Sequence, residues 1–380
     1  MIDPLEHIRE LAQAIGPRPS TGEGERQAAA YVGGQLEKFG YLVKQEPFRS
    51  PSSLSQVYIP IYLLALLGFV ADALGNLAFA LLLTGVALVC FLGENTTSLK
   101  LISAVIPKAK SLNVVARLAP RELPRRRLVL VAHMDSTRPG LMWHPKLVKG
   151  FRAAFLVLVV CLAVLPVLVI LEAVTGQRFF FPLAIPFALY IAGALLVLIH
   201  REIFYRHGQG ANDNASGVGV MLTMAEVMAL DAPAETEVMI VATGCEEAGL
   251  VGMQSFLRRH QDELARSWII NIDNVGAGDV TYTTLEGMLI PRRTGRELTE
   301  TAAKVALLPG IRVTGAPFRT MSTDTDPALL RGLEAITVTA TRDGAPVNWH
   351  LKTDTFENID PDSVDMAYRF VEQVVRRLIA

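Results

Sequence analysis

Five side chains of the types that bind metal ions occur in well-separated parts of this 380-residue sequence. Two are imidazoles and three are carboxylates: His133, Asp213, Glu247, Asp273 and His350. This mixture of nitrogen and oxygen ligands suits zinc, with manganese or cobalt as alternatives. If Asp213 bridges two ions, each ion has one histidine, one terminal carboxylate and one shared oxygen. A water then fits between ions about 3.5–4 Å apart and loses a proton near neutral pH. The set predicts a two-metal centre that activates water.

Two further carboxylates lie beside these candidate ligands. Glu246 directly precedes Glu247, and we expect it to act as the general base that takes a proton from the water and passes it to a leaving amine. Adjacent side chains on an extended strand point in opposite directions, but a tight turn in this glycine-bounded loop can direct one carboxylate to a metal and the other to the water. Asp135 follows His133 by two residues, so we expect it to accept a hydrogen bond from the second ring nitrogen.

Each of these residues can also be explained by an ordinary structural role. Asp213 stands between two asparagines at the start of a helical pattern, where an acidic residue is a typical N-cap. The Glu246–Glu247 pair resembles a solvated surface pair, and His350 could be a buried, hydrogen-bonded histidine. All of them follow expected strands or open an expected helix in one chain, and this combination favours the metal site.

The surrounding sequence alternates between strand and helix patterns. The expected strands are Tyr41–Phe48, Leu112–Leu118, Leu128–Ala132, Glu237–Ala242, Ser267–Ile272 and Ala335–Thr339. The expected helices are Pro4–Ile15, Glu23–Phe39, Val218–Leu230, Leu250–Arg266, Gly295–Ala306 and Pro361–Ile379. This order predicts an α/β fold with a mostly parallel mixed sheet covered by helices on both faces. Ligands of such sheets lie beyond the carboxyl ends of the strands, where the candidate metal residues occur.

Four uncharged, apolar segments interrupt this pattern: Leu54–Ala71, Leu77–Leu92, Ala153–Leu171 and Phe179–Ile199. Each has about the length needed to cross a bilayer. Buried core hairpins are the alternative, but four such segments in two pairs with short polar turns favour membrane spans. We therefore expect transmembrane hairpins at 54–93 and 151–200, inserted into a catalytic domain made of 1–53, 94–150 and 201–380.

Composition is consistent with this division. Hydrophobic residues make up 51% and charged residues 19% of the chain, and the net charge of −1 gives no support to nucleic-acid binding. The three cysteines are widely separated and indicate neither a disulfide framework nor a cysteine-based zinc site.

Charge also predicts which side of the membrane carries the metal ligands. Two hairpins return the chain twice to its starting side, and the polar N-terminal sequence does not resemble a signal peptide. The turns within the two hairpins carry one basic residue, Arg178. The ends at which the hairpins join the expected catalytic domain carry eight: Arg49, Lys100, Lys108, Lys146, Lys149, Arg152, Arg201 and Arg206. The positive-inside rule therefore predicts a multi-pass protein of a bacterial or archaeal plasma membrane, with its catalytic domain in the cytoplasm.

Several short motifs resemble those of the M28 family of zinc aminopeptidases. They are Gly16-Pro17-Arg18-Pro19, Asn113-Val114-Val115-Ala116, Ala132-His133-Met134-Asp135-Ser136, Gly210 to Gly217, Glu246-Glu247-Ala248-Gly249-Leu250, Asn271-Ile272-Asp273, Trp349-His350 and Asp354-Thr355-Phe356-Glu357-Asn358. The resemblance covers nearly all of the chain outside the apolar hairpins. It implies a zinc-exopeptidase fold of the phosphorylase/hydrolase-like type and the removal of N-terminal residues from peptides.

The resemblance also assigns roles to the candidate ligands. His133 and Asp273 are expected to hold one zinc ion. Glu247 and His350 are expected to hold the second, with Asp213 bridging the two.

The same resemblance makes Glu246 the general base and implies a cis peptide bond between Asp213 and Asn214. Two departures stand out. Thr323-Asp324-Thr325 occupies the place where many members carry Ser-Asp-His, which puts any substrate contact by that histidine in doubt. Both apolar hairpins are inserted in connections, where they need not disturb the metal site.

The leading hypothesis is therefore a membrane-anchored, two-zinc aminopeptidase acting on peptides, including hydrophobic or membrane-delivered ones; the sequence leaves its oligomeric state open. A one-zinc glutaminyl cyclase of the same superfamily is the first alternative, and a non-catalytic scaffold is the second, although no ligand is missing. A transporter fits poorly, because Asp72, Glu172 and Arg178 lie at the ends of the apolar segments and not at mid-bilayer.

Overall fold

The computed structural model describes residues 3–96 and 100–380, and the chain divides into two compact units. The sheet unit consists of Met1–Ser52, Lys108–Pro139 and His207–Ala380, and the helical unit consists of Ser53–Pro107 and Gly140–Arg206. The helical unit extends beyond the expected hairpins at 54–93 and 151–200, because short helices next to the long ones pack with them.

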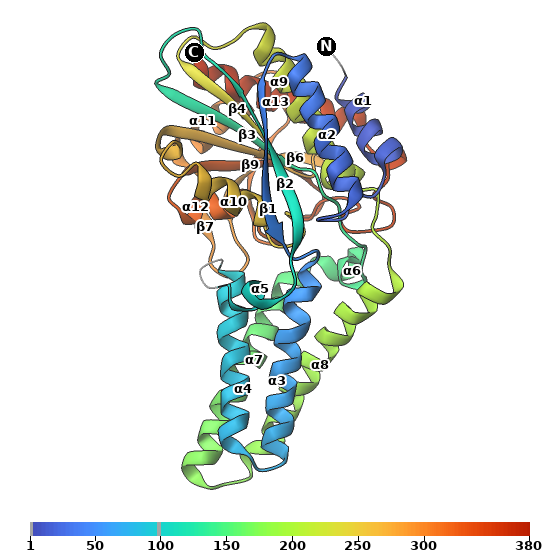
Figure 1. The fold of residues 1–380 in the computed structure, drawn as a ribbon, viewed down its shortest axis with the longest axis vertical. Helices are drawn as coiled ribbons and strands as arrows, with labels where there is room; N and C mark the ends of the chain where they lie inside the picture. Colours follow the sequence, from blue (N-terminus) through green and yellow to red (C-terminus); the bar gives the residue numbers. More distant parts are fainter. Residues whose placement is uncertain (1–2, 97–99) are drawn as a thin grey trace. The chain divides into compact units, whose positions relative to one another are not determined.

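Nine strands among the described residues form one mixed sheet in the sheet unit (Figure 1). They are β1 Leu42–Ser50, β2 Ala109–Leu118, β3 Arg126–His133, β4 Thr236–Thr243, β5 Ser267–Ile272, β6 Asp279–Glu286, β7 Arg292–Arg293, β8 Thr314–Phe318 and β9 Glu334–Thr341. The order is β1-β2-β4-β3-β5-β9-β6-β7, with β8 paired to β6. The central strands β4, β3, β5 and β9 are parallel. Their carboxyl ends therefore meet at one edge of the sheet.

Helices cover both faces of this sheet. They are α1 Pro4–Arg9, η1 Glu10–Ile15, α2 Glu23–Lys38, η3 Ala211–Ser216, α9 Gly217–Leu230, α10 Val251–Arg259, η4 Leu264–Arg266, α11 Arg296–Ala306, α12 Thr325–Leu330, η5 Phe356–Asn358 and α13 Pro361–Ile379. Alternate residues of β3 point to opposite faces, as the strand pleat requires. Leu128 and Leu130 lie in the larger core with α2, α9 and α13, whereas Val129 and Val131 pack with α10 and α12.

The sheet unit departs from the sequence-based expectation in two respects. The helix predicted over Leu250–Arg266 ends at Arg259, because the chain turns after His260 and continues as the short η4. Strands β6 and β8 and helix α12 were not predicted. β6 contains three threonines, β8 has five residues that include a glycine and a proline, and α12 has six residues, so none of them carries a strong hydrophobic period.

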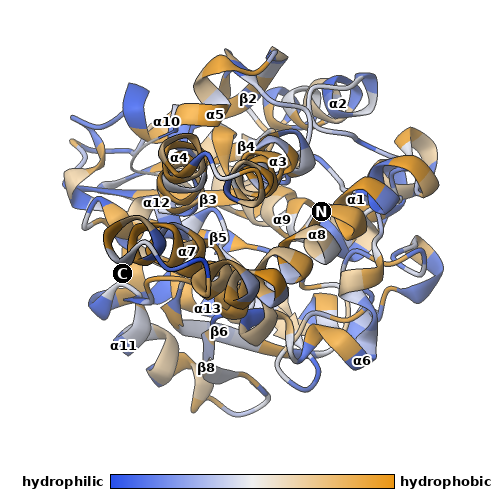
Figure 2. Ribbon diagram, turned by 90° about the horizontal axis from the view of Figure 1, so that it is seen from below, coloured by the Kyte–Doolittle hydropathy of each residue, from blue (hydrophilic) through white to orange (hydrophobic). Residues whose placement is uncertain are grey.

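Four long apolar helices make up most of the helical unit, in which α3 and α4 form one hairpin and α7 and α8 the other. They are α3 Leu54–Ala73, α4 Leu77–Asn95, α7 Phe151–Thr175 and α8 Phe180–Phe204, accompanied by the short α5 Leu101–Val105, η2 Leu141–Trp143 and α6 Pro145–Val148. All four are long and apolar enough to cross a membrane. Figure 2 shows their ribbons strongly coloured for hydrophobic residues. Leu67, Leu82, Val160 and Leu189 are each more than half exposed, as in helices that face lipid.

One charged cluster joins the two hairpins at their turns. Arg178, between α7 and α8, lies 2.6 Å from Glu172 Oε1 and 3.3 Å from Asp72 Oδ1, and it donates to the Ala73 carbonyl over 2.8 Å. Both carboxylates are buried. The three charges stand at helix ends, as the sequence indicated, and their pairing ties the turn of one hairpin to the end of the other.

Candidate metal centre

All five candidate ligands lie at the edge where the central strands end. His133 is the last residue of β3, Asp273 directly follows β5, and Glu247 lies in the loop after β4. Asp213 belongs to η3, before α9, and His350 lies in the loop after β9. Residues separated by up to 217 positions in the sequence, His133 and His350, therefore reach one site, because parallel strands deliver their carboxyl ends to the same edge.

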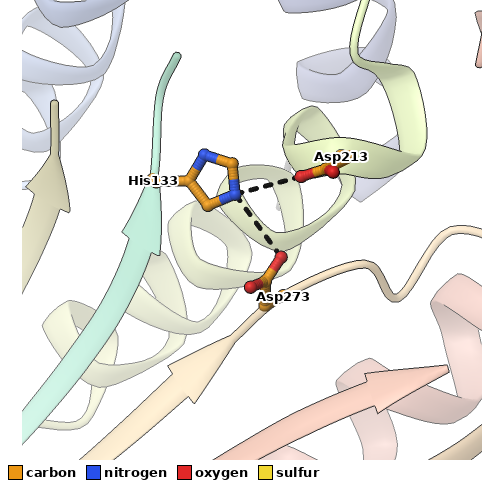
Figure 3. Close-up of side chains that lie close together, drawn as sticks. All are labelled: His133, Asp213 and Asp273. Atoms are coloured by element: carbon orange, nitrogen blue, oxygen red, sulfur yellow. Dashed lines mark ion pairs between the residues drawn. The ribbon is translucent and has the colours of Figure 1, made fainter. Parts of the chain in front are cut away.

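The five ligands form two groups that share Asp213. His133 Nε2 lies 3.1 Å from Asp213 Oδ1 and 3.5 Å from Asp273 Oδ1 (Figure 3). His350 Nε2 lies 3.0 Å from Asp213 Oδ2 and 3.1 Å from Glu247 Oε1. The two oxygens of Asp213 thus face different histidines, and within each group the ligand atoms lie within 4.8 Å of one another. This is the geometry required of a bridging carboxylate.

The spacing and the hydrogen bonding both fit a pair of zinc ions. Ligand atoms about 3.3 Å apart are expected around a tetrahedral ion with bond lengths of about 2.0–2.1 Å. Asp213 Oδ2 and Glu247 Oε1 are buried and, within the described residues, receive no hydrogen bond of suitable geometry. Buried carboxylate oxygens without a donor are costly. A cation between these oxygens and the imidazoles would satisfy them.

Burial and opposite charges set the protonation of the cluster. Burial disfavours ionisation of Asp213, but the two facing histidines outweigh it and lower its pKa. Burial likewise opposes the charged form of His350, whereas Glu247 and Asp213 raise its pKa to about 9. Burial, reinforced by Glu247, Asp273 and Asp324 against the opposing pull of His133, raises the pKa of Glu246 well above its usual range. The surroundings of Glu246 therefore favour its protonated form.

Asp135 contacts both the loop of Glu246 and the ring of His133. Its carboxylate accepts from the backbone N–H groups of Glu246 and Glu247 over 3.1 and 3.2 Å and from Ser20 Oγ over 2.6 Å. His133 Nδ1 lies 3.1 Å from the backbone carbonyl of Asp135 and 3.5 Å from its carboxylate. The residue thus supports the histidine mainly through its carbonyl, while its side chain fixes the loop that carries the base.

A second buried acid, Glu25 of α2, supports the same loop. It accepts from the Cys245 N–H, the Thr21 N–H and the Ser111 hydroxyl, each over 2.8 Å. Burial and the nearby Asp135 raise its pKa to about 7. Sequence reasoning missed Glu25, because nothing distinguishes it from other helical glutamates.

The segment of Asp213 is held from two sides. Asn214 Oδ1 accepts from the N–H groups of Gly217 and Asn274, and Asp354 accepts from the N–H groups of Asn212 and Asp213. Asn214, and not Asp213, therefore provides the side-chain bond at the helix start, which leaves the Asp213 carboxylate to the histidines. The Asp213–Asn214 peptide bond is cis, as the resemblance implied. Asp354 was part of a quoted motif, but its role had no sequence signal.

The Thr323-Asp324-Thr325 segment is buried next to the site. Thr325 is fully buried, and its hydroxyl lies 2.8 Å from that of Thr337, so it points into the interior. Asp324 accepts from the Thr243 hydroxyl over 2.5 Å. Thr323 donates to Glu286 Oε2 and Thr283 donates to Glu286 Oε1, each over 2.6 Å. Threonine thus belongs to a buried hydroxyl cluster at the place where many M28 members carry histidine.

Glu286→Gln is expected to remove a pH-dependent loss of stability. Burial raises the pKa of Glu286 from 4.5 to about 7. Because the folded-state pKa lies above the unfolded-state value, the stabilisation is complete below pH 4.5 and is lost as the pH rises through 7. The shift corresponds to about 3 kcal/mol. The unfolding temperature of the wild type should therefore fall relative to that of Glu286→Gln from about pH 5 to about pH 8.

Glu300→Gln, at an exposed carboxylate, is the control, and its unfolding temperature should follow that of the wild type. If the unfolding temperatures of all three proteins change in parallel with pH, the prediction is wrong.

Comparisons with known proteins relate part of the chain to a peptidase family. Residues 195–375 match the model of Peptidase family M28. The alkaline phosphatase isozyme conversion protein of Escherichia coli is 35% identical over 111 residues, 29% of this chain and 32% of that protein. Aminopeptidase YwaD of Bacillus subtilis is 40% identical over 85 residues, 20% of this chain and 18% of that protein. The chain thus spans a third or less of these relatives.

The structural similarity to known proteins covers much more of the chain than the sequence similarity does. A zinc aminopeptidase from Bacillus subtilis superposes with a TM-score of 0.59 over 99% of this chain and 94% of that one, at 16% identity. The chain therefore has the mixed α/β fold of zinc exopeptidases. The match to Peptidase family M28 covers the part of the chain that carries Asp213, Glu247, Asp273 and His350, and the relatives that this chain resembles include an aminopeptidase.

Proposed function

We propose that this protein is a membrane-anchored, two-zinc aminopeptidase that removes N-terminal residues from peptides. The observation that carries the proposal is the position of Asp213, whose two carboxylate oxygens lie 3.1 and 3.0 Å from the ring nitrogens of two different histidines. A carboxylate with one partner on each side is suited to hold two ions close together. An ordinary structural ion pair needs one acid for each histidine, whereas three buried acids, Asp213, Glu247 and Asp273, surround two histidines here.

In this proposal, His133 and Asp273 would hold one zinc ion, Glu247 and His350 would hold the other, and Asp213 would be shared between them. The ions would polarise the scissile carbonyl and lower the pKa of the attacking water. Glu246 takes the proton from that water and delivers it to the nitrogen of the leaving amine. Asp135 and Glu25 keep the Glu246 loop in place through its backbone N–H groups, so the base does not have to reorganise during the reaction.

We infer further that α3, α4, α7 and α8 span the membrane and that the sheet unit lies in the cytoplasm. The lengths and exposed apolar side chains of these helices support the spans, and the basic residues near their sheet-unit ends support the orientation. Anchoring favours hydrophobic or membrane-delivered peptides as substrates, since such peptides concentrate at the bilayer.

The orientation can be measured by cysteine labelling in intact cells. Gln177, exposed in the turn between α7 and α8, is replaced by cysteine, and Glu300 on α11 is the matched exposed position in the sheet unit. A membrane-impermeant maleimide should label Gln177→Cys and spare Glu300→Cys until the cells are opened. The reverse pattern would place the sheet unit outside the cell.

The activity is tested by measuring zinc content and aminoacyl-anilide hydrolysis on the same detergent-purified protein. We expect about two zinc ions per chain, hydrolysis that a chelator abolishes, and recovery when zinc is restored. About one ion with cyclisation of N-terminal glutamine would instead identify a glutaminyl cyclase. Absence of both metal and turnover would identify a non-catalytic scaffold.

A further inference from the structure

Arg18 is a fully buried arginine that the proposed reaction does not use. Its guanidinium donates to five backbone carbonyl oxygens, those of Leu11, Gly16, Met134, Gln209 and Gly210, over 2.8, 3.0, 2.7, 2.6 and 2.8 Å. The rigid fork of arginine can serve several acceptors in fixed directions, which a lysine ammonium cannot. A buried charge satisfied by carbonyls alone indicates that the position of those carbonyls matters.

The carbonyls belong to three segments that are distant in sequence. Leu11 and Gly16 lie in the N-terminal segment, Met134 directly follows the candidate ligand His133, and Gly210 lies three residues before the bridging Asp213. The helices α7 and α8 separate the last two in the chain. Arg18 therefore connects the His133 segment to the Asp213 segment across that insertion.

Backbone contacts around Arg18 leave little room for adjustment. Its N–H donates to Ser136 Oγ over 3.0 Å, and the Ser136 N–H donates to its carbonyl over 2.8 Å. Gly210 has a φ of +60°, and a Cβ there would lie 2.5 Å from Ser136 Cβ and 3.0 Å from Arg18 Nη2. The two ligand-bearing segments thus meet at a tightly packed point with the guanidinium between them.

The charge of Arg18 also acts on the site. Burial lowers its pKa to about 10, against the attraction of Asp354, Asp135 and Asp213. The guanidinium therefore remains charged at neutral pH. It supplies a fixed positive charge close enough to Asp354, Asp135 and Asp213 to act on them.

We propose that Arg18 is a positioning residue that sets the spacing between His133 and Asp213, and so controls the affinity of the ion in the His133–Asp213–Asp273 group. The bonds of Arg18 reach the segments of His133 and Asp213 but not those of Glu247 and His350. Its loss is therefore expected to weaken one ion more than the other. The inference rests on the proposed two-zinc function.

The test compares the wild-type protein with Arg18→Lys and Arg18→Met, all as detergent-purified full-length chains. Zinc is withdrawn with increasing concentrations of a chromophoric chelator, and the remaining ions are counted. In Arg18→Lys, which keeps the charge but loses the fork, we expect one ion to be removed at about tenfold lower chelator concentration while the second is unchanged, a change in Kd worth about 1.4 kcal/mol. Arg18→Met is expected to retain only the second ion.

A purely structural role would give a different result. In that case the metal-free variants would unfold at lower temperature, but the increase in unfolding temperature on adding zinc would equal that of the wild type. Arg117→Lys is the matched control, since Arg117 lies on β2 opposite Met239, away from the carboxyl end of β4, and bonds Glu237 and Glu263. It should retain both ions with wild-type affinity.

The outcomes separate this inference from the proposed function. If the folded Arg18→Lys protein holds both ions with wild-type affinity, the positioning role is overturned, even if Arg18→Met fails to fold. If both ions weaken equally, the selective effect on the His133 group is wrong. If the wild type itself binds no zinc, the two-zinc proposal fails first.

Discussion

Glu246→Gln is expected to lower kcat by about 10²–10⁴-fold while the protein retains both zinc ions. The amide has nearly the shape of the carboxyl group but cannot take a proton from water or pass it to the leaving amine. Its burial and its position next to Glu247 place it in the site without making it a member of either ligand group. The measurement is aminoacyl-anilide hydrolysis alongside zinc content on the same preparation.

Glu247→Gln is the matched control, because it makes the same chemical change one residue further along the chain. Glu247 Oε1 lies 3.1 Å from His350 Nε2, so its loss should release the ion of that group. The two neighbours are thus expected to fail in different ways, one by chemistry and one by metal binding. Wild-type kcat in Glu246→Gln, or loss of metal there, would show that Glu246 is not the base.

Asp213→Asn is expected to remove both ions and to abolish hydrolysis. Asparagine is neutral and has one acceptor oxygen, and its NH₂ group presents hydrogens where the second ion needs an electron pair. Since the two oxygens of Asp213 face His133 and His350, both groups lose a ligand at once. The zinc content after gel filtration in metal-free buffer measures this directly.

Asp273→Asn provides the comparison for a terminal ligand. Of the two candidate histidines, Asp273 Oδ1 faces only His133 among the described residues, so this variant should lose the ion of the His133 group and keep the other. The contrast between two ions lost and one ion lost is the mark of a bridge. If Asp213→Asn retains one ion as tightly as Asp273→Asn does, Asp213 is a terminal ligand and the bridging assignment is wrong.

The sequence by itself determined the layout of the fold and named the candidate ligands that the structure brings together. The apolar strands ending at His133 and at Ile272 are visible because a strand buried on both faces reads as a continuous apolar run. The four apolar helices are visible because a segment of 19 to 25 residues without a charge in its middle has the length and composition of a membrane span. The candidate ligands follow from these elements, since parallel strands bring their carboxyl ends together.

The tertiary structure alone decided how the site is supported. Asp135 holds two N–H groups 111 and 112 residues away, and Arg18 holds carbonyls 116 and 192 residues away. Such contacts leave no local period or spacing in the sequence, because they depend on where loops meet after the sheet has formed. Sequence patterns report which elements form and which faces they bury; the bonds between distant loops arise only when those elements pack.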